Sequence, residues 1–327
     1  MFLDEELIPL PLQKTLGPFI AARRAPKVAR RYAEIGGRSP IYDWTRRQGD
    51  AMVQLLDEIA PESAPHKAYI AFRYAEPLAT TALQEMRRDG VKRAVAFTQY
   101  PQWSCSMTGA SLNDMWRMLR GLDMEGEFRW SVIDRWPVHP GFIAAMTDTV
   151  RRGLEQFDEQ QRADVLIQFS AHSLPLSVID RGDAYPQKIA ASVQAVMEQL
   201  YFSHPFILTY QSAVGPVRWQ GPNTERVVHE LGRQKRRNVL IVPIAFTSDH
   251  IETLHEIDIE LAETARVAGV NLKRAPALND SPIFTRALAD IVAAHLRSGE
   301  RHGSQYTLRC PGCTNAECRG LPEQVIF

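Results

Sequence analysis

The segment NVLIVPIAFTSDH, residues 238–250, is the part of the sequence that decides the fold. It is a short, nearly continuous apolar run that ends in polar residues, and DVLIQFSAHS at residues 164–173 has the same form. Strands that are apolar on both faces are typical of a parallel sheet that helices cover on both sides. The two segments therefore favour an α/β protein with parallel strands.

Outward from these segments, short apolar runs alternate with longer stretches of helical periodicity, as βαβ units require. The predicted strands are residues 68–74, 92–100, 128–134, 164–170, 206–211 and 238–247. The predicted helices are residues 49–59, 141–157, 186–200, 225–235, 252–268 and 282–296. A short echo, AFTQ at 96–99 and AFTS at 245–248, indicates two similar halves with a boundary near residue 160.

Length and composition narrow the class of protein. The 327 residues exceed what one hydrophobic core usually serves, and 45% apolar with 23% charged residues is ordinary for a folded soluble protein. Lys plus Arg equals Asp plus Glu at 38 each, so the basic surface of a nucleic-acid-binding protein is not expected. The longest strongly apolar run, Val239 to Phe246, is too short to span a bilayer, and no signal or transit peptide is visible.

Polar residues follow three of the predicted strands. In open α/β sheets, ligands bind beyond the carboxyl ends of the strands. A single histidine there is commonly a packing or capping residue, whereas two histidines with carboxylates nearby indicate a site that moves protons or holds a metal. The residues are His172 after one strand, Asp249, His250 and Glu252 after another, and Tyr100 and Cys105 after a third.

Three glutamates follow the second of these clusters at intervals of four residues. Glu252, Glu256 and Glu260 would line up on one face of a helix. Such a row is either a solvated acidic face or a carboxylate track that carries cations or protons between a site and solvent. The spacing leaves both interpretations open.

The four cysteines are too few for a disulfide scaffold in a chain of this length. Cys310, Cys313 and Cys318 form a CxxC motif with a third cysteine close behind, and Cys105 is the remaining thiol. Metal ligation is the better interpretation. From the spacing alone, structural zinc and an iron–sulfur cluster are equally compatible.

The segments QFSAHSLP at 168–175 and VPIAFTSDHIETLHEIDIE at 242–260 resemble the two signature segments of ferrochelatases, which insert ferrous iron into protoporphyrin IX to form haem. The resemblance continues through AFRYAEPL at 71–78, FTQYPQWSCSMTG at 97–109 and DRGDAYPQKI at 180–189. It implies a lyase with two Rossmann-like halves of the chelatase fold and a porphyrin cleft between them. We expect the halves to span residues 1–160 and 161–300, with a C-terminal extension at 301–327.

The resemblance also implies roles for the polar clusters. Metal insertion removes two pyrrole N–H protons, and a base that titrates near neutrality suits this step. By resemblance, His172 is the proton acceptor, while His250, Glu252 and Asp249 support proton removal or metal delivery. Glu256 and Glu260 are the expected iron or proton conduit.

Further residues match the porphyrin-binding walls of the family. The expected substrate-binding residues are Arg24, Tyr32 and Ser39 for the propionates, Arg73, Tyr74 and Tyr100 on the wall opposite the histidines, and Trp219 and Phe246 against the ring. The apolar segment at residues 2–20 resembles the family's membrane-facing lip. The resembling enzymes begin with a strand before this lip, whereas Met1 stands where the lip starts, so we expect a longer protein or a sheet closed in another way.

The resemblance is to the eukaryotic type of ferrochelatase, which implies a 2Fe–2S cluster held by Cys105, Cys310, Cys313 and Cys318. Ferrous iron and protoporphyrin IX are the expected substrates, without nucleic acid. Homodimerisation and peripheral association with the matrix side of the mitochondrial inner membrane are family expectations. The alternatives are a chelatase for another divalent metal and a non-catalytic porphyrin- or haem-binding protein.

Overall fold

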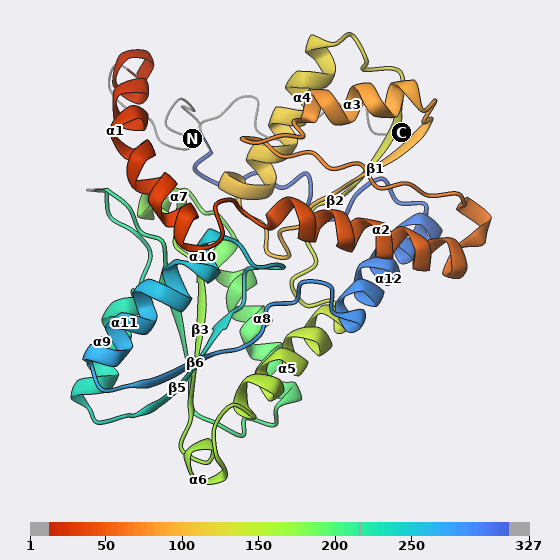
Figure 1. Ribbon diagram of the computed structural model, residues 1–327. Helices are drawn as coiled ribbons and strands as arrows, with labels where there is room; N and C mark the ends of the chain where they lie inside the picture. Colours follow the sequence, from red (N-terminus) through yellow and green to blue (C-terminus); the bar gives the residue numbers. More distant parts are fainter. Residues whose placement is uncertain (1–12, 216, 314–327) are drawn as a thin grey trace.

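Two parallel sheets flanked by helices form the body of the protein (Figure 1). The computed structural model describes residues 13–215 and 217–313. The first sheet pairs β1 (Arg93–Phe97) with β2 (Arg129–Ile133). The second sheet has the order β4-β3-β5-β6, with β3 (Leu166–His172), β4 (Phe206–Gln211), β5 (Asn238–Pro243) and β6 (Asn271–Arg274), all parallel. The predicted α/β class is confirmed.

The register of the second sheet brings the polar strand ends together. His172 at the end of β3 lies opposite Gln211 at the end of β4. Ser170 lies opposite Pro243, the last residue of β5. Because the strands are parallel, the segments that leave β3, β4 and β5 all start from the same edge of the sheet.

Helices cover both faces of the second sheet. They are α6 (Glu159–Arg162), α7 (Leu176–Asp180), α8 (Tyr185–Gln199), α9 (Thr224–Arg233), α10 (Ile251–Leu254), the π-helical turn η3 (Glu256–Leu261), α11 (Ala262–Val267) and α12 (Pro282–Ser298). The strands between them are apolar on both sides: Ile167, Phe169 and Leu240 have no exposed surface. This burial explains why the strands read as continuous apolar runs.

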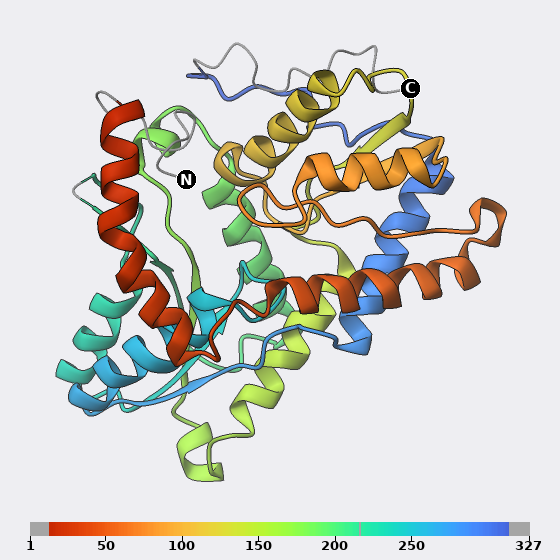
Figure 2. The ribbon, with the colours of Figure 1, turned by 45° about the horizontal axis from the view of Figure 1, so that its top comes forward.

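The first half carries α1 (Gln13–Glu34), α2 (Ile41–Ile59), η1 (Pro61–Ser63), α3 (Ala79–Arg88), η2 (Cys105–Gly109), α4 (Ala110–Gly121) and α5 (Pro140–Leu154). A separate apolar core lies between α3, α4 and the first sheet, with Trp116 and Trp130 edge to face at 5.1 Å. In Figure 2, α3 and α4 lie together over this sheet, while α1 extends away from the body.

Helix α5 packs on the second sheet, although it precedes residue 160. Gly153 of α5 approaches so closely that an added Cβ would lie 2.7 Å from the Leu240 side chain of β5. In turn, α12 packs against both α5 and α2. The two halves therefore share one large hydrophobic core, which extends from Leu56 of α2 to Phe284 of α12.

One predicted strand is absent, and one predicted helix contains a π-helical turn. Residues 68–74 do not form a strand, because the Phe72 amide donates to the Pro77 carbonyl at 2.8 Å and only an isolated bridge, to Leu78, is present among the described residues. The helix predicted at residues 252–268 is three successive pieces, α10, η3 and α11. The π-helical turn spans Glu256–Leu261, so Glu256 and Glu260 lie on it while Glu252 lies on α10.

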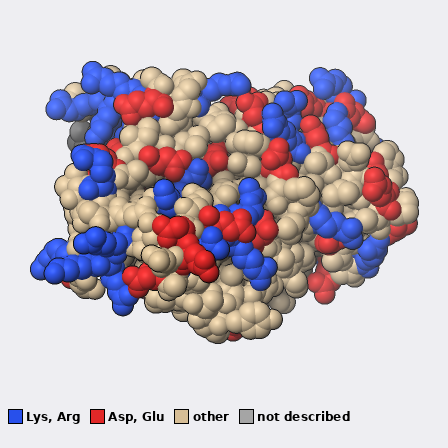
Figure 3. All heavy atoms as spheres, turned by 60° about the horizontal axis from the view of Figure 1, so that its bottom comes forward, with Lys and Arg blue, Asp and Glu red and all other residues tan. Residues whose placement is uncertain are grey.

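The surface charge and the hydropathy of the helices can be compared with what the composition indicates. On the face shown in Figure 3, acidic and basic side chains lie among one another over most of the surface. Within the described ranges, no helix is both long and apolar enough to cross a membrane.

Candidate active site

His172 is the last residue of β3 and is partly buried at the sheet edge, with 26% of its side chain exposed. Its Nδ1 lies 2.6 Å from the carbonyl oxygen of Ser173. A carbonyl oxygen only accepts, so Nδ1 carries the hydrogen and donates it. The other ring nitrogen, Nε2, is therefore the one that can take up a proton, and it faces Glu252.

Glu252 joins the two histidines of the site. One carboxylate oxygen lies 3.7 Å from His172 Nε2, and the other lies 3.5 Å from His250 Nε2. Desolvation opposes ionisation of this carboxyl group, but the neighbouring histidines outweigh it and lower the pKa of Glu252 to about 2. The carboxylate is therefore ionised at neutral pH and can stabilise a positive charge on either ring.

The loop after β5 sets this geometry. His250 is extended and stands immediately before α10, where its amide donates to the Thr253 hydroxyl at 3.0 Å. Two residues later Glu252 falls in the first turn of α10, near the positive end of its peptide dipoles. Phe246 lies beside the His250 ring, with ring centroids 4.9 Å apart.

Gln211 is a site residue that the sequence prediction missed. Its side-chain amide donates to the Glu252 carbonyl at 2.9 Å and to a Glu256 carboxylate oxygen at 3.2 Å, while its own oxygen accepts from Ser170 at 2.7 Å. Ser212 donates a further hydrogen bond to Glu256. The available signal was its position at the end of β4, level with His172.

Glu256 differs electrostatically from Glu252. Desolvation and the negative charge of Glu252 raise the pKa of Glu256, and the hydrogen bonds from Ser212 and Gln211 oppose this shift only in part. Two neighbouring carboxyl groups thus have pKa values displaced in opposite directions. Of the two, Glu256 is the carboxyl group that more readily holds a proton.

The other two predicted carboxylates lie apart from this pair. Asp249 accepts hydrogen bonds from Arg274, Asn279 and Thr253, so its side chain braces the loop. Glu260 pairs with Arg31 of α1 at 2.6 Å. Of the four predicted catalytic residues, the structure brings His172, His250 and Glu252 into one group.

The predicted residues of the opposite wall lie near this group. Desolvation and the Glu252 carboxylate raise the pKa of Tyr100, with Arg73 acting in the opposite direction, so all three share one electrostatic environment. The Arg73 guanidinium stands 5.3 Å from the centre of the Tyr74 ring. The Tyr74 side chain is about half exposed.

The residues predicted to bind propionates come from α1 and the start of α2. Desolvation and the Glu252 carboxylate raise the pKa of Tyr32, so Tyr32 is within electrostatic reach of Glu252. Arg24 lies two turns earlier on α1 and is partly exposed. The Ser39 hydroxyl accepts a hydrogen bond from the amide of Ile41, the first residue of α2, at 3.3 Å.

The two predicted aromatic contacts come from loops of the second half. Trp219 is half-buried, and its indole N–H donates to the Val214 carbonyl at 2.9 Å. Phe246 lies against His250, as described above, and is also half-buried. Both rings are held in place while keeping part of their surface open for contact with a flat ligand.

Cys105 and the segment that carries Cys310 and Cys313 both contact the turn that follows α7. Asp183 is buried and accepts from the Cys105 amide at 2.7 Å, while the Gly312 amide donates to the Arg181 carbonyl at 2.9 Å. Burial raises the pKa of the Cys105 thiol, and Asp183 and Cys310 raise it further. Cys318 lies outside the described residues, and within them no three His, Cys, Asp or Glu side chains are grouped closely enough to form a metal centre.

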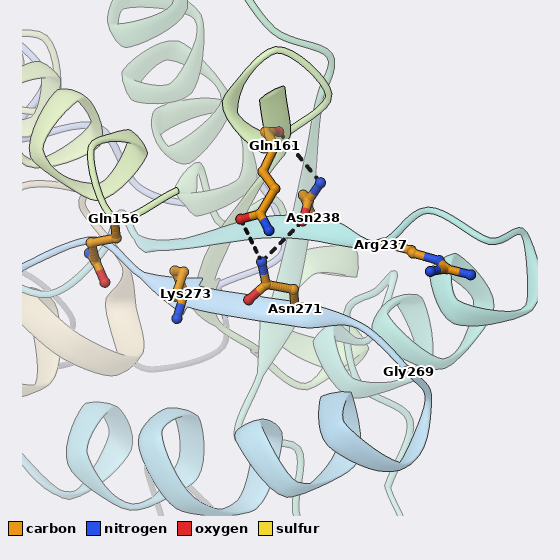
Figure 4. Close-up of a pocket in the computed structure, with 7 residues that line it drawn as sticks. All are labelled: Gln156, Gln161, Arg237, Asn238, Gly269, Asn271 and Lys273. Carbon is orange, nitrogen blue, oxygen red and sulfur yellow. Dashed lines mark hydrogen bonds between the residues drawn. The ribbon is translucent and has the colours of Figure 1, made fainter. Parts of the chain in front are cut away.

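A polar pocket lies at the opposite end of the second sheet, where β5 and β6 begin (Figure 4). Asn271 there donates to Asn238 at 3.1 Å and to Gln161 at 3.4 Å, so the amide groups bond one another. The pocket is far from the histidines in the fold because it opens at the amino ends of the strands.

The family model described as ferrochelatase matches residues 1–296. The chain belongs to the ferrochelatase family. It is 52% identical to the mitochondrial ferrochelatase of Xenopus laevis over 97% of this chain and 78% of that protein. Against the corresponding protein of Bos taurus the identity is 53%, over 98% of this chain and 77% of that protein, and against that of Schizosaccharomyces pombe it is 48%, over 97% and 75%.

Solved structures show the same fold at low sequence identity. The SirB protein of Bacillus subtilis, in a structure described as containing Fe3+, has a TM-score of 0.54 at 12% identity, covering 79% of this chain and 92% of that chain. The sirohydrochlorin chelatase SirB from Bacillus subtilis subspecies spizizenii, with cobalt, has a TM-score of 0.51 at 10% identity, covering 77% and 91%. The predicted family and the chelatase fold are both confirmed.

Proposed function

We propose that this protein inserts Fe2+ into protoporphyrin IX to form protohaem, with His172 as the group that accepts the pyrrole protons. The observation that carries the proposal is the group of His172, Glu252 and His250 at the sheet edge of a ferrochelatase-family chain. Metal insertion needs a base beside the porphyrin nitrogens and a negative charge to stabilise the protonated base. His172 supplies the first and Glu252 the second.

The test is an anaerobic assay with Fe2+ and protoporphyrin IX, in which loss of porphyrin fluorescence and growth of the haem absorption band report turnover. We expect both changes together. Porphyrin binding without metal insertion would refute the enzymatic role, and insertion of only another divalent metal would refute iron as the substrate.

Protons are proposed to leave His172 through Glu252 and Glu256. Nε2 of His172 takes up each proton while Nδ1 stays bonded to the Ser173 carbonyl. Glu252 stabilises the charged ring from 3.7 Å. Because the pKa of Glu256 is raised, this carboxyl group is better suited than Glu252 to carry a proton onward toward solvent. Glu260 would stand at the outer end of this route, and Asp249 would hold the loop that presents His250.

We propose that the residues predicted from the sequence to bind the porphyrin form its binding surface. The residues are Arg24, Tyr32 and Ser39 for the propionates, Arg73, Tyr74 and Tyr100 opposite the histidines, and Trp219 and Phe246 against the ring. Arginine suits a propionate because its guanidinium bonds a carboxylate with two parallel hydrogen bonds. The shared electrostatic environment of Tyr32, Tyr100 and Glu252 supports one continuous binding surface.

We propose that Cys105, Cys310, Cys313 and Cys318 hold a 2Fe–2S cluster. The donor set fits, because the Cys105 and Cys310 thiols interact and the CxxC turn is closed by a 3.0 Å bond from the Cys313 amide to the Cys310 carbonyl. Thiolate sulfur is the ligand that iron–sulfur clusters take, and iron ligation would offset the cost of ionising buried thiols. When bound, the cluster would join the C-terminal tail to the first half.

We also propose for this protein the family's domain division, mitochondrial location, membrane attachment and homodimer. The division into halves at residues 1–160 and 161–300, with the extension at 301–327, is supported by the position of one sheet on each side of residue 160. The relatives named above are mitochondrial proteins, which supports a mitochondrial location here. Peripheral attachment to the matrix side of the inner membrane and a homodimer can be tested by fractionation with carbonate extraction and by light scattering of the purified protein.

A further inference from the structure

His255 is a buried histidine for which the proposed chemistry has no use. It stands between α10 and η3 with 3% of its surface exposed. Its Nε2 lies 2.8 Å from a carboxylate oxygen of Glu34, the last residue of α1. On its other side, Nδ1 lies 3.8 Å from a carboxylate oxygen of Glu260. The ring thus stands between two carboxylates that come from opposite ends of the chain.

Helix α1 has little other packing. None of residues 18–34 is fully buried. In both views, α1 extends away from the body and its C-terminal end comes beside the α10 and η3 region (Figures 1 and 2). The second connection at this end is the 2.6 Å ion pair of Arg31 with Glu260, which also faces His255. Four side chains, Arg31, Glu34, His255 and Glu260, therefore join the last turn of α1 to η3.

The position of this cluster ties it to the active site. Tyr32 lies two residues before Glu34, and the Glu252 carboxylate raises the Tyr32 pKa, so the two groups are within electrostatic reach. Glu256, which follows His255 directly, is held by Gln211 and Ser212 on the site side. Any displacement of α1 from η3 would move Tyr32 away from these carboxylates.

We propose that His255 is a positioning residue that clasps α1 onto η3 and thereby sets the position of the porphyrin-binding wall. The proposal rests on the proposed function in that α1 contacts the porphyrin. The clasp has two links, the His255–Glu34 contact at 2.8 Å and the Arg31–Glu260 ion pair at 2.6 Å. The His255 ring is buried and the Glu34 carboxylate is about half exposed, so this hydrogen bond to a carboxylate is only partly open to water and can hold an otherwise exposed helix end.

The test compares His255→Leu, which removes both ring nitrogens, with His255→Gln, whose amide nitrogen can still donate to Glu34. The first readout is amide hydrogen exchange over residues 24–34 in the protein without substrate. We expect about tenfold faster exchange in His255→Leu, corresponding to about 1.4 kcal/mol, and a return most of the way to the wild-type rate in His255→Gln. The second readout is kinetic: KM for protoporphyrin should rise about tenfold in His255→Leu while kcat stays within about twofold.

Asp57→Ala is a matched control because it also removes a carboxylate that pairs with a histidine. Asp57 lies on α2, and its carboxylate oxygen is 2.6 Å from Nδ1 of His66. This variant should leave exchange in α1 unchanged. Glu34→Ala should reproduce His255→Leu, and the double variant should be no worse than either single one. Unchanged α1 exchange in His255→Leu, or the same increase in Asp57→Ala, would overturn the proposal. Since the exchange measurement uses no substrate, it stays decisive even if the wild-type protein fails to metallate porphyrin, a result that would refute only the proposed function.

Discussion

Replacing Glu252 with glutamine tests the electrostatics of the site most sharply, because the side chain keeps its shape and loses its charge. Two unit charges about 4 Å apart interact by about 4 kcal/mol at an effective dielectric constant of about 20. The Glu252 carboxylate lies 3.7 Å from His172 Nε2, but a quarter of its side chain is exposed. Solvent screening reduces the effect, and we take about 2 kcal/mol, or about 30-fold in rate.

Glu252→Gln should therefore lower kcat about 30-fold while porphyrin binding is retained, because the protonated form of His172 loses its counter-ion. The assay is anaerobic turnover with Fe2+ and protoporphyrin IX, alongside porphyrin binding measured by fluorescence. Glu263→Gln is the control, since Glu263 is an exposed carboxylate of α11 that pairs with Arg266. A kcat for Glu252→Gln within twofold of wild type would refute the reasoning.

Three further predictions concern the surroundings of the site and the core. Glu256→Gln should raise the melting temperature at pH 8 and change it little at pH 4. Because folding raises the pKa of Glu256, the wild-type carboxyl group favours folding at low pH and loses this contribution as the pH rises through its pKa. Thermal melts at the two pH values test this, and an unchanged melting temperature at pH 8 would contradict it. Gln211→Ala should lower kcat about tenfold by freeing Glu256 and the α10 backbone, whereas Gln194→Ala, on the exposed side of α8, should leave kcat unchanged. Gly153→Ala should destabilise the protein by about 1–3 kcal/mol in urea unfolding, because its Cβ would meet Leu240 at 2.7 Å; an unchanged midpoint would mean that α5 does not pack on β5 in this way.

The sequence predicted the parts of the site that depend on one strand and the residues that follow it. His172, His250 and Glu252 lie just beyond apolar runs, and a parallel sheet brings such positions to one edge. The apolar runs at 164–170, 206–211 and 238–247 match β3, β4 and β5 closely. Local pattern and sheet geometry were sufficient for these elements.

Sequence patterns could not predict contacts between segments that are far apart in the chain. Gln211 reads as the polar end of a strand, and only the register beside β3 shows that it holds Glu252 and Glu256. His255 looks like a residue in the middle of a helix, and its partner Glu34 is 221 positions away. The π-helical turn likewise has no recognisable sequence signal, and neither has the ion pair of its Glu260 with Arg31 of α1.

The strand prediction at residues 68–74 was wrong for a different physical reason. The composition of this segment suits a strand, but a strand exists only where a neighbour pairs with it. Here the Phe72 amide donates its hydrogen bond to the carbonyl oxygen of Pro77, five residues later in the chain, and not to a neighbouring strand. Propensity alone does not supply the partner.

The most direct test of the central claim is a comparison of the wild-type protein with His172→Ala in anaerobic metallation of protoporphyrin IX by Fe2+. The wild-type protein should form protohaem, and His172→Ala should lose about 100-fold or more of kcat while still binding porphyrin, since Nε2 of His172 is the proposed proton acceptor. Near-normal turnover by His172→Ala would contradict this assignment, and porphyrin binding without turnover by the wild-type protein would contradict the function itself.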